Sequence, residues 1–146
     1  MKKKKYELID KVDIVDGHTL YRILALRKFN DVKAGDLGGF IESEDNLSHD
    51  SNCWVYGKAQ IFGNAHITEM AWITGNSRVY GNACVERRAW ISGNAHVFGD
   101  ARICGDKCIH MGGNTKLDHG IWTRELVIAG NVYLLSSTLE KFLIEG

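Results

Sequence analysis

The chain has 146 residues, with 18 basic and 18 acidic side chains, 16 glycines and no proline. This length suits a single domain, and the balanced charge argues against a protein whose main task is to grip a nucleic-acid backbone. No apolar run is long enough for a membrane-spanning helix, and Tyr6 to Asp16 is too charged for a signal peptide. We therefore expect a cytoplasmic protein with reduced cysteines.

The N-terminal segment is expected to cap one end of the fold. Residues 6 to 29 are predicted to form a β-hairpin, because Asp16-Gly17 is a hairpin-turn signal between two strand-like runs. The basic residues 1 to 5 are expected to stay solvated. We assign residues 1 to 36 to this cap.

Ten consecutive hexads follow, from Val55 to Asn114. The first place is Val or Ile in all ten, the fifth is Ala or Ser in the first eight, and the third is Gly in seven. A period of six is neither helical nor a plain strand alternation. It predicts a short strand followed by a tight corner, with the branched first residue inward and glycine at the turn.

A second period indicates three sides. Trp54, Trp72 and Trp90 lie 18 residues apart, so three hexads make one coil of a solenoid. Stacked coils pair as parallel strands and bury each other's apolar edges. We expect about four coils within residues 37 to 114, the first being degenerate, with His49 where Ile belongs.

The C-terminal segment, residues 115 to 146, is expected to form a second cap. Leu126 to Leu135 is interpreted as a hairpin around Gly130-Asn131. Ser137 to Glu140 has the spacing of a capping box, which favours a short helix over 138 to 144, with a strand as the alternative.

These hexads resemble the hexapeptide-repeat family of left-handed parallel β-helices, and the handedness is what the resemblance implies. The fold class we predict is therefore all-β, a short three-sided parallel β-helix with β-rich caps. The lead-in at 20 to 48 resembles a module of uncharacterised bacterial and prophage hexapeptide-repeat proteins.

Hexad positions two and six should point outward, so residues 18 apart form columns on the surface. The predicted binding or interface residues are Trp54, Trp72 and Trp90, in a column that ends at Cys108, and Phe62, Tyr80 and Phe98 beside Arg78. So many large rings do not fit inside a narrow solenoid, and exposed apolar patches usually mark an interface. The alternatives are a homo-oligomer contact, a stacking platform for a base or sugar ring, and cover by the caps.

Histidines are the candidates for catalysis, because the resemblance implies acyltransferases that use a histidine base and a coenzyme A thioester. His66 and His96 both follow Gly-Asn-Ala and should point outward, and His119 lies near the C-terminal cap. No long loop projects from the coils to wall a cleft around such a base. We therefore do not predict an enzyme, and we expect no cofactor.

One group of side chains has the ligand types that zinc prefers. Cys104, Cys108 and His110, with Cys84 one coil away, are the candidates. Their spacing is not that of a standard zinc knuckle, so we predict no metal site.

The function that we predict is that of a non-catalytic binding protein, a homotrimer as the family resemblance implies. The resemblance to prophage proteins implies a phage-derived protein that acts against host defence by binding a host protein or a small nucleotide signal. Two alternatives stay open, an acyltransferase-like enzyme with a site between subunits and a purely structural assembly module. No membrane partner is expected.

Overall fold

A computed structural model describes residues 4–105, 109–123, 126–128, 130 and 132–135. The chain begins with an antiparallel hairpin of β1 (Tyr6–Val15) and β2 (His18–Ala25), followed by β3 (Leu37–Ile41) and the short 3₁₀ helix η1 (Glu44–Asn46). Asp16 and Gly17 both have positive φ angles, 49° and 81°, as a tight hairpin turn requires. The predicted N-terminal hairpin is confirmed.

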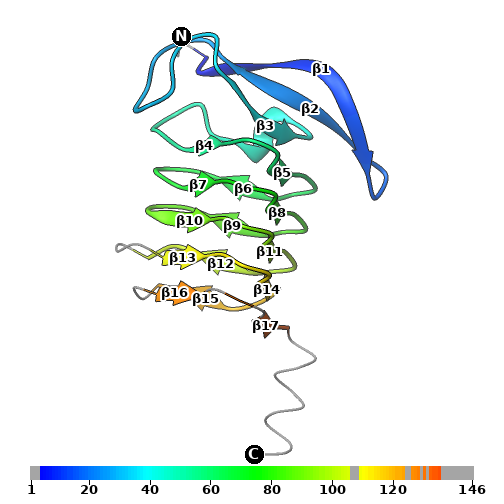
Figure 1. Ribbon diagram of the computed structural model, residues 1–146, viewed down its shortest axis with the longest axis vertical. Coiled ribbons are helices and arrows are strands. Elements are labelled where there is room, and N and C mark those ends of the chain that lie inside the picture. Colours follow the sequence, from blue (N-terminus) through cyan, green and yellow to red (C-terminus); the bar gives the residue numbers. More distant parts are fainter. Residues whose placement is uncertain (1–3, 106–108, 124–125, 129, 131, 136–146) are drawn as a thin grey trace, which may run out of the picture.

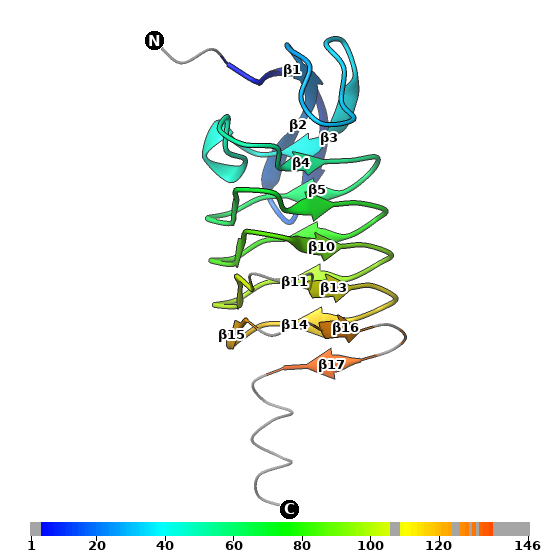
Figure 2. The same ribbon diagram turned by 90° about the vertical axis from the view of Figure 1, so that its left-hand side faces the viewer.

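Below the hairpin, short strands stack as a three-sided solenoid (Figures 1 and 2). In the described part of the chain they are β4 (Trp54–Val55), β5 (Gln60–Ile61), β6 (His66–Ile67), β7 (Trp72–Ile73), β8 (Arg78–Val79), β9 (Cys84–Val85), β10 (Ala89–Ile91), β11 (His96–Val97), β12 (Arg102–Ile103), β13 (Ile109–Met111), β14 (Lys116–Leu117), β15 (Ile121–Trp122), β16 (Leu126–Ile128) and β17 (Tyr133–Leu134).

Three sheets form the sides of the solenoid. The eight-stranded sheet has the order β1-β2-β3-β5-β8-β11-β14-β17, the five-stranded sheet β16-β13-β10-β7-β4 and the four-stranded sheet β15-β12-β9-β6. Apart from the N-terminal antiparallel pairings, every pairing between these strands is parallel. The predicted parallel β-helix is confirmed, with about five coils rather than four. No helix among the described residues is long and apolar enough to cross a membrane.

The hexad rule matches the core. All ten first-place residues are fully buried, and so are the small fifth-place residues. The first-place residues are Val55, Ile61, Ile67, Ile73, Val79, Val85, Ile91, Val97, Ile103 and Ile109. At the corners, six of the seven third-place glycines have positive φ, and Glu69 and Arg87 adopt the same conformation in the two hexads without glycine.

Gly93→Ala is expected to destabilise the solenoid by about 3 kcal/mol. The residue has a φ of +62°, and an added Cβ would lie 2.8 Å from the Gly113 nitrogen of the next coil. The cost combines left-handed backbone strain with overpacking. Gly57→Ala is the matched control, because Gly57 has nearly the same φ of +61° but its nearest atom would be 3.8 Å away. Equal losses in denaturant unfolding of the two variants would contradict the packing argument.

The register changes by two residues after Ile103. Ile91 pairs with Met111, 20 residues later, so Met111 and not Ile109 continues the first-place column of the five-stranded sheet. From Met111 the pattern continues through Leu117, Trp122, Ile128 and Leu134, which all pair in parallel with the coil above.

The predicted hairpin at 126–135 is therefore wrong. β16 and β17 pair in parallel with β13 and β14, so this segment continues the β-helix beyond the boundary that we predict at 114. The predicted short helix over 138 to 144 lies outside the described residues. In the first coil, Leu47 rather than His49 takes the inward place, because Leu47 is fully buried and bridges Ile67.

The N-terminal cap buries one residue, Lys5, that was expected to stay solvated. Lys5 is fully buried, and its Nζ donates a hydrogen bond of 2.7 Å to the carbonyl oxygen of Cys53. The Phe29 ring lies 5.0 Å from the same nitrogen. The expectation of a solvated start is thus wrong for Lys5, which ties the N-terminus to the first coil.

Candidate binding faces

An apolar column runs along the outside of the five-stranded sheet. Trp54, Trp72 and Trp90 pair in register on β4, β7 and β10, as predicted. Below them the column continues with His110 and Val127. The predicted end of the column at Cys108 is wrong, because the two-residue shift after Ile103 places His110 in that position; Cys108 itself lies outside the described residues.

The N-terminal cap covers only the first of these rings. Trp54 is 1% exposed and packs against Phe29 and Tyr6, with ring centroids 5.1 and 6.2 Å away. Trp72 and Trp90 remain 37% and 38% exposed. The N-terminal cap therefore covers Trp54, whereas the indoles of Trp72 and Trp90 stay exposed and can make another contact.

A pocket of about 320 Å³ lies beside the two exposed indoles. It is lined by Met70, Trp72, Arg88, Ala89 and Trp90. The described lining thus offers two aromatic rings, a thioether and one guanidinium group. Such a surface suits an apolar or aromatic side chain with a nearby negative charge.

Trp90 is held in place by polar contacts. Its indole Nε1 donates to Thr74 Oγ1 at 2.9 Å, and its ring stacks on His110 with centroids 4.2 Å apart. His110 Nε2 lies 2.7 Å from Ser92 Oγ. The lower wall of the pocket is therefore pre-organised, which reduces the entropy lost on binding.

A second aromatic column lies on the eight-stranded sheet. Phe62, Tyr80 and Phe98 stack with centroids 4.9 and 5.0 Å apart and with planes within 7° of parallel. Both faces of the Tyr80 ring are occupied by its neighbours. The hairpin buries Phe62, which is 2% exposed and contacts His18. A ligand would therefore meet the edge of the Tyr80 ring rather than its face.

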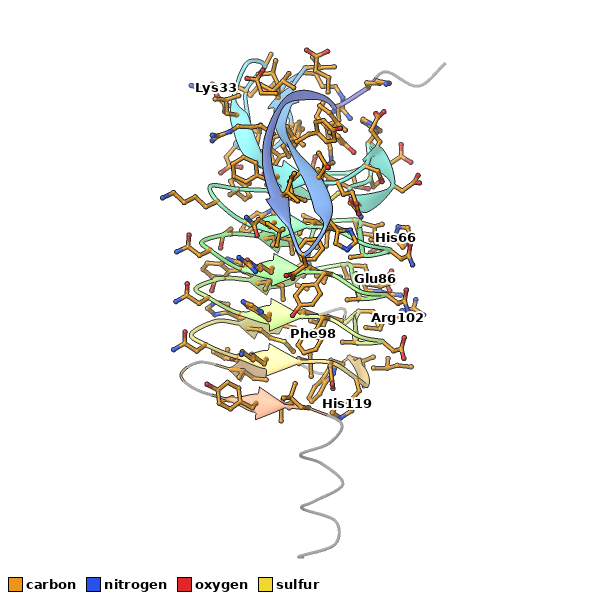
Figure 3. The ribbon with its side chains drawn as sticks, turned by 90° about the vertical axis from the view of Figure 1, so that its right-hand side faces the viewer. Lys33, His66, Glu86, Phe98, Arg102 and His119 are labelled. Carbon is orange, nitrogen blue, oxygen red and sulfur yellow. The ribbon has the colours of Figure 1, made fainter. Side chains whose placement is uncertain are left out.

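The hairpin leaves the lower part of this sheet uncovered. Figure 3 shows it lying across the upper strands of the sheet, with Phe98 below its tip. Arg78 lies beside the ring column, in register with His96 on the next strand.

The three candidate catalytic histidines lie apart. His66 is on the four-stranded sheet, where its Nδ1 is 2.7 Å from the carbonyl oxygen of Asp45, and His96 is on the eight-stranded sheet. His119 follows β14, and its Nδ1 lies 2.8 Å from Asp118 Oδ1. Figure 3 shows His66 and His119 at different heights of the solenoid. Of the three, only His119 is oriented by a described carboxylate.

No group of three or more metal-ligating side chains forms within the described residues. Cys84 and Cys104 are free and partly buried, and burial raises the pKa of the Cys84 thiol. His110, the other candidate ligand, stacks under Trp90 on the five-stranded sheet.

Parallel coils with a branched residue inward and a small residue at each corner define the class of this molecule. It is a parallel β-helix whose coils are built from a six-residue repeat, as in the hexapeptide-repeat proteins that the sequence resembles. No family model matches the chain. In an alignment 56 residues long that covers 34% of this chain, the sequence is 45% identical to a protein of Escherichia coli strain K12 described as "Uncharacterized acetyltransferase YdcK". The matched stretch spans 17% of that protein's length.

Proposed function

We propose that this protein is a non-catalytic binding module that associates with further copies of itself through its tryptophan face. We define this face as the pocket residues Met70, Trp72, Arg88, Ala89 and Trp90 together with His110 and Val127. The observation that carries the proposal is the pair of indoles, each more than one-third exposed beside a pocket. Aromatic residues and Arg are enriched in protein interfaces.

The shape of the face supports side-by-side assembly. The column is straight because each of its residues pairs in register with the next, from Trp54 to Val127. Val127, at its lower end, is 71% exposed. Three parallel copies can bring this straight face to a common threefold axis, and closed cyclic symmetry is common in soluble oligomers. A trimer is the form we propose, from the hexapeptide-repeat resemblance.

Trp72→Lys combined with Trp90→Lys is expected to yield a folded monomer. Two ammonium groups in an apolar contact would each lose hydration without a partner. Light scattering coupled to size exclusion should give a multiple of the chain mass for the parent protein and the single-chain mass for the variant. Ile121→Lys is the control, because Ile121 is an apolar residue 70% exposed on the four-stranded sheet. An unchanged mass in the double variant would refute the proposal.

The expected host protein or small nucleotide signal, and the phage origin, stay predictions with no support beyond the resemblance of the lead-in. If a partner of either kind binds to the tryptophan face, the same double variant should no longer bind that partner. Thermal shift with cyclic nucleotides, before and after the double substitution, checks the nucleotide case.

A second candidate function is acyl transfer, with His119 as the base. The ion-pair distance of 2.8 Å between His119 and Asp118 favours it, as does the printed name of the E. coli relative. A carboxylate that orients a histidine is a common arrangement for a general base. Under our proposal, acetyl-coenzyme A causes no thermal shift. A shift that His119→Gln abolishes would favour the enzyme instead.

A further inference from the structure

A column of basic side chains runs down the outside of the eight-stranded sheet. Arg78 of β8 pairs in register with His96 of β11, and His96 pairs with Lys116 of β14. Adjacent strands are roughly 4.8 Å apart, so Arg78 and Lys116 emerge roughly 10 Å from each other with His96 between them. The 18-residue spacing does not predict that Lys116 lies in this column, because the register shifts by two residues after Ile103.

These charges have no anionic partner within the part of the chain that the structure describes. The ion pairs found there involve Lys4, His18, His49, Arg102 and His119, not Arg78 or Lys116. Lys116 Nζ instead lies 5.7 Å from the Tyr133 ring centroid. Asp118, on the same sheet face, pairs with His119. Arg78 and Lys116 thus form no ion pair with a described carboxylate.

The groups on either side of the column also suit an anion. On one side lie the edges of the Tyr80 and Phe98 rings, and the edge of an aromatic ring carries its positive partial charge. On the other side, Asn94 and Asn114 form an amide ladder two residues before His96 and Lys116, with a hydrogen bond of 3.3 Å between them. Side-chain amides can donate N–H groups to oxyanions.

His96 makes the charge of the column depend on pH. Burial holds the pKa of His96 below its ordinary value, and the positive charges of Arg78 and Lys116 lower that pKa further. Among the described residues, Tyr80 also faces it, with its hydroxyl 3.5 Å from His96 Nδ1. Burial raises the pKa of the Tyr80 hydroxyl, and the negative charge of Asp16, at the hairpin tip, also acts to raise it. Near neutral pH the column therefore carries two charges, and in acid it gains a third.

We propose that this basic column is a binding site for a small polyanion that carries several phosphate groups, with Arg78 and Lys116 as its fixed charges. A single phosphate is too small to reach both ends of the column, whereas linked phosphates can follow it. Arg and Lys are the usual phosphate-binding residues. Proteins that grip a duplex neutralise several of its phosphates, for example roughly 6–10, more than three side chains contact. The site lies on a different sheet from the tryptophan face and does not depend on assembly.

The test uses inorganic tripolyphosphate as the probe in calorimetric titrations of the full chain at low ionic strength. Arg78→Gln combined with Lys116→Gln is expected to weaken binding at least tenfold at pH 7. Arg102→Gln is the matched control, because Arg102 occupies the equivalent outward place on the four-stranded sheet but pairs with Glu86 at 2.9 Å. It should bind as tightly as the parent.

The variant His96→Gln isolates the pH-dependent part of tripolyphosphate binding. As the pH is lowered from 8 into the acid range, the parent protein should gain affinity relative to His96→Gln. Both are titrated under the same conditions, so the protonation of the probe is common to both. Absence of binding, equal weakening by Arg102→Gln, or identical pH profiles for the parent and His96→Gln would overturn the proposal. Tighter binding of a single-stranded oligonucleotide than of tripolyphosphate would overturn it in favour of a nucleic-acid partner.

Discussion

Ile73→Asp is expected to prevent folding of the chain. Ile73 is fully buried in β7, and the residues in register above and below it are Val55 and Ile91. A carboxylate there would be surrounded by apolar side chains. Burying an unpaired charge costs several kcal/mol, a large part of the 5–15 kcal/mol or so by which a typical domain is stable. Each coil contacts only its neighbours, so a disrupted coil also separates the coils on either side.

Circular dichroism and thermal unfolding measure this effect. Ile73→Val is the matched control, because it keeps the branched shape and removes one methylene group; a loss of about 1 kcal/mol is expected from it. A cooperative transition of Ile73→Asp at the parent temperature would mean that the inward assignment of the first hexad place is wrong.

Lys5→Ala is expected to destabilise the protein by about 3 kcal/mol, although Lys5 belongs to a run of four lysines. Its ammonium donates to the Cys53 carbonyl at 2.7 Å and lies 3.4 Å from Cys53 Sγ. Truncation leaves a buried carbonyl with one partner fewer and opens a cavity under Phe29.

Lys4→Ala isolates the contribution of burial. The Lys4 side chain is 62% exposed, and its pair with Glu44 spans 3.3 Å at the surface. An exposed pair of this kind contributes at most about 1 kcal/mol. Lys5→Met, which restores apolar volume without the hydrogen bond, should fall between the two alanine variants. Equal free energies of unfolding for Lys4→Ala and Lys5→Ala in urea would contradict the anchoring role of Lys5.

The sequence predicts only part of the two candidate binding faces. The 18-residue spacing places Trp72 under Trp54 and Tyr80 under Phe62, as observed. It does not show that the cap covers the first ring of each column, because those contacts link residues far apart in sequence. His18, for example, packs against Phe62, and Phe29 against Trp54. The pocket depends in turn on which rings the cap leaves exposed.

By itself, the sequence determined the fold of the coils. One inward branched residue, one small residue and one corner repeat through the first eight hexads, and each coil needs only its neighbours to complete its strands. Tertiary structure alone decided the rest. The two-residue shift after Ile103 places His110 under Trp90 and Lys116 under His96, and parallel pairing brings β16 and β17 into the β-helix. Lys5 is buried by contacts 48 residues away. A local period carries no information about such contacts, because they depend on which surfaces remain unpaired once the coils have stacked.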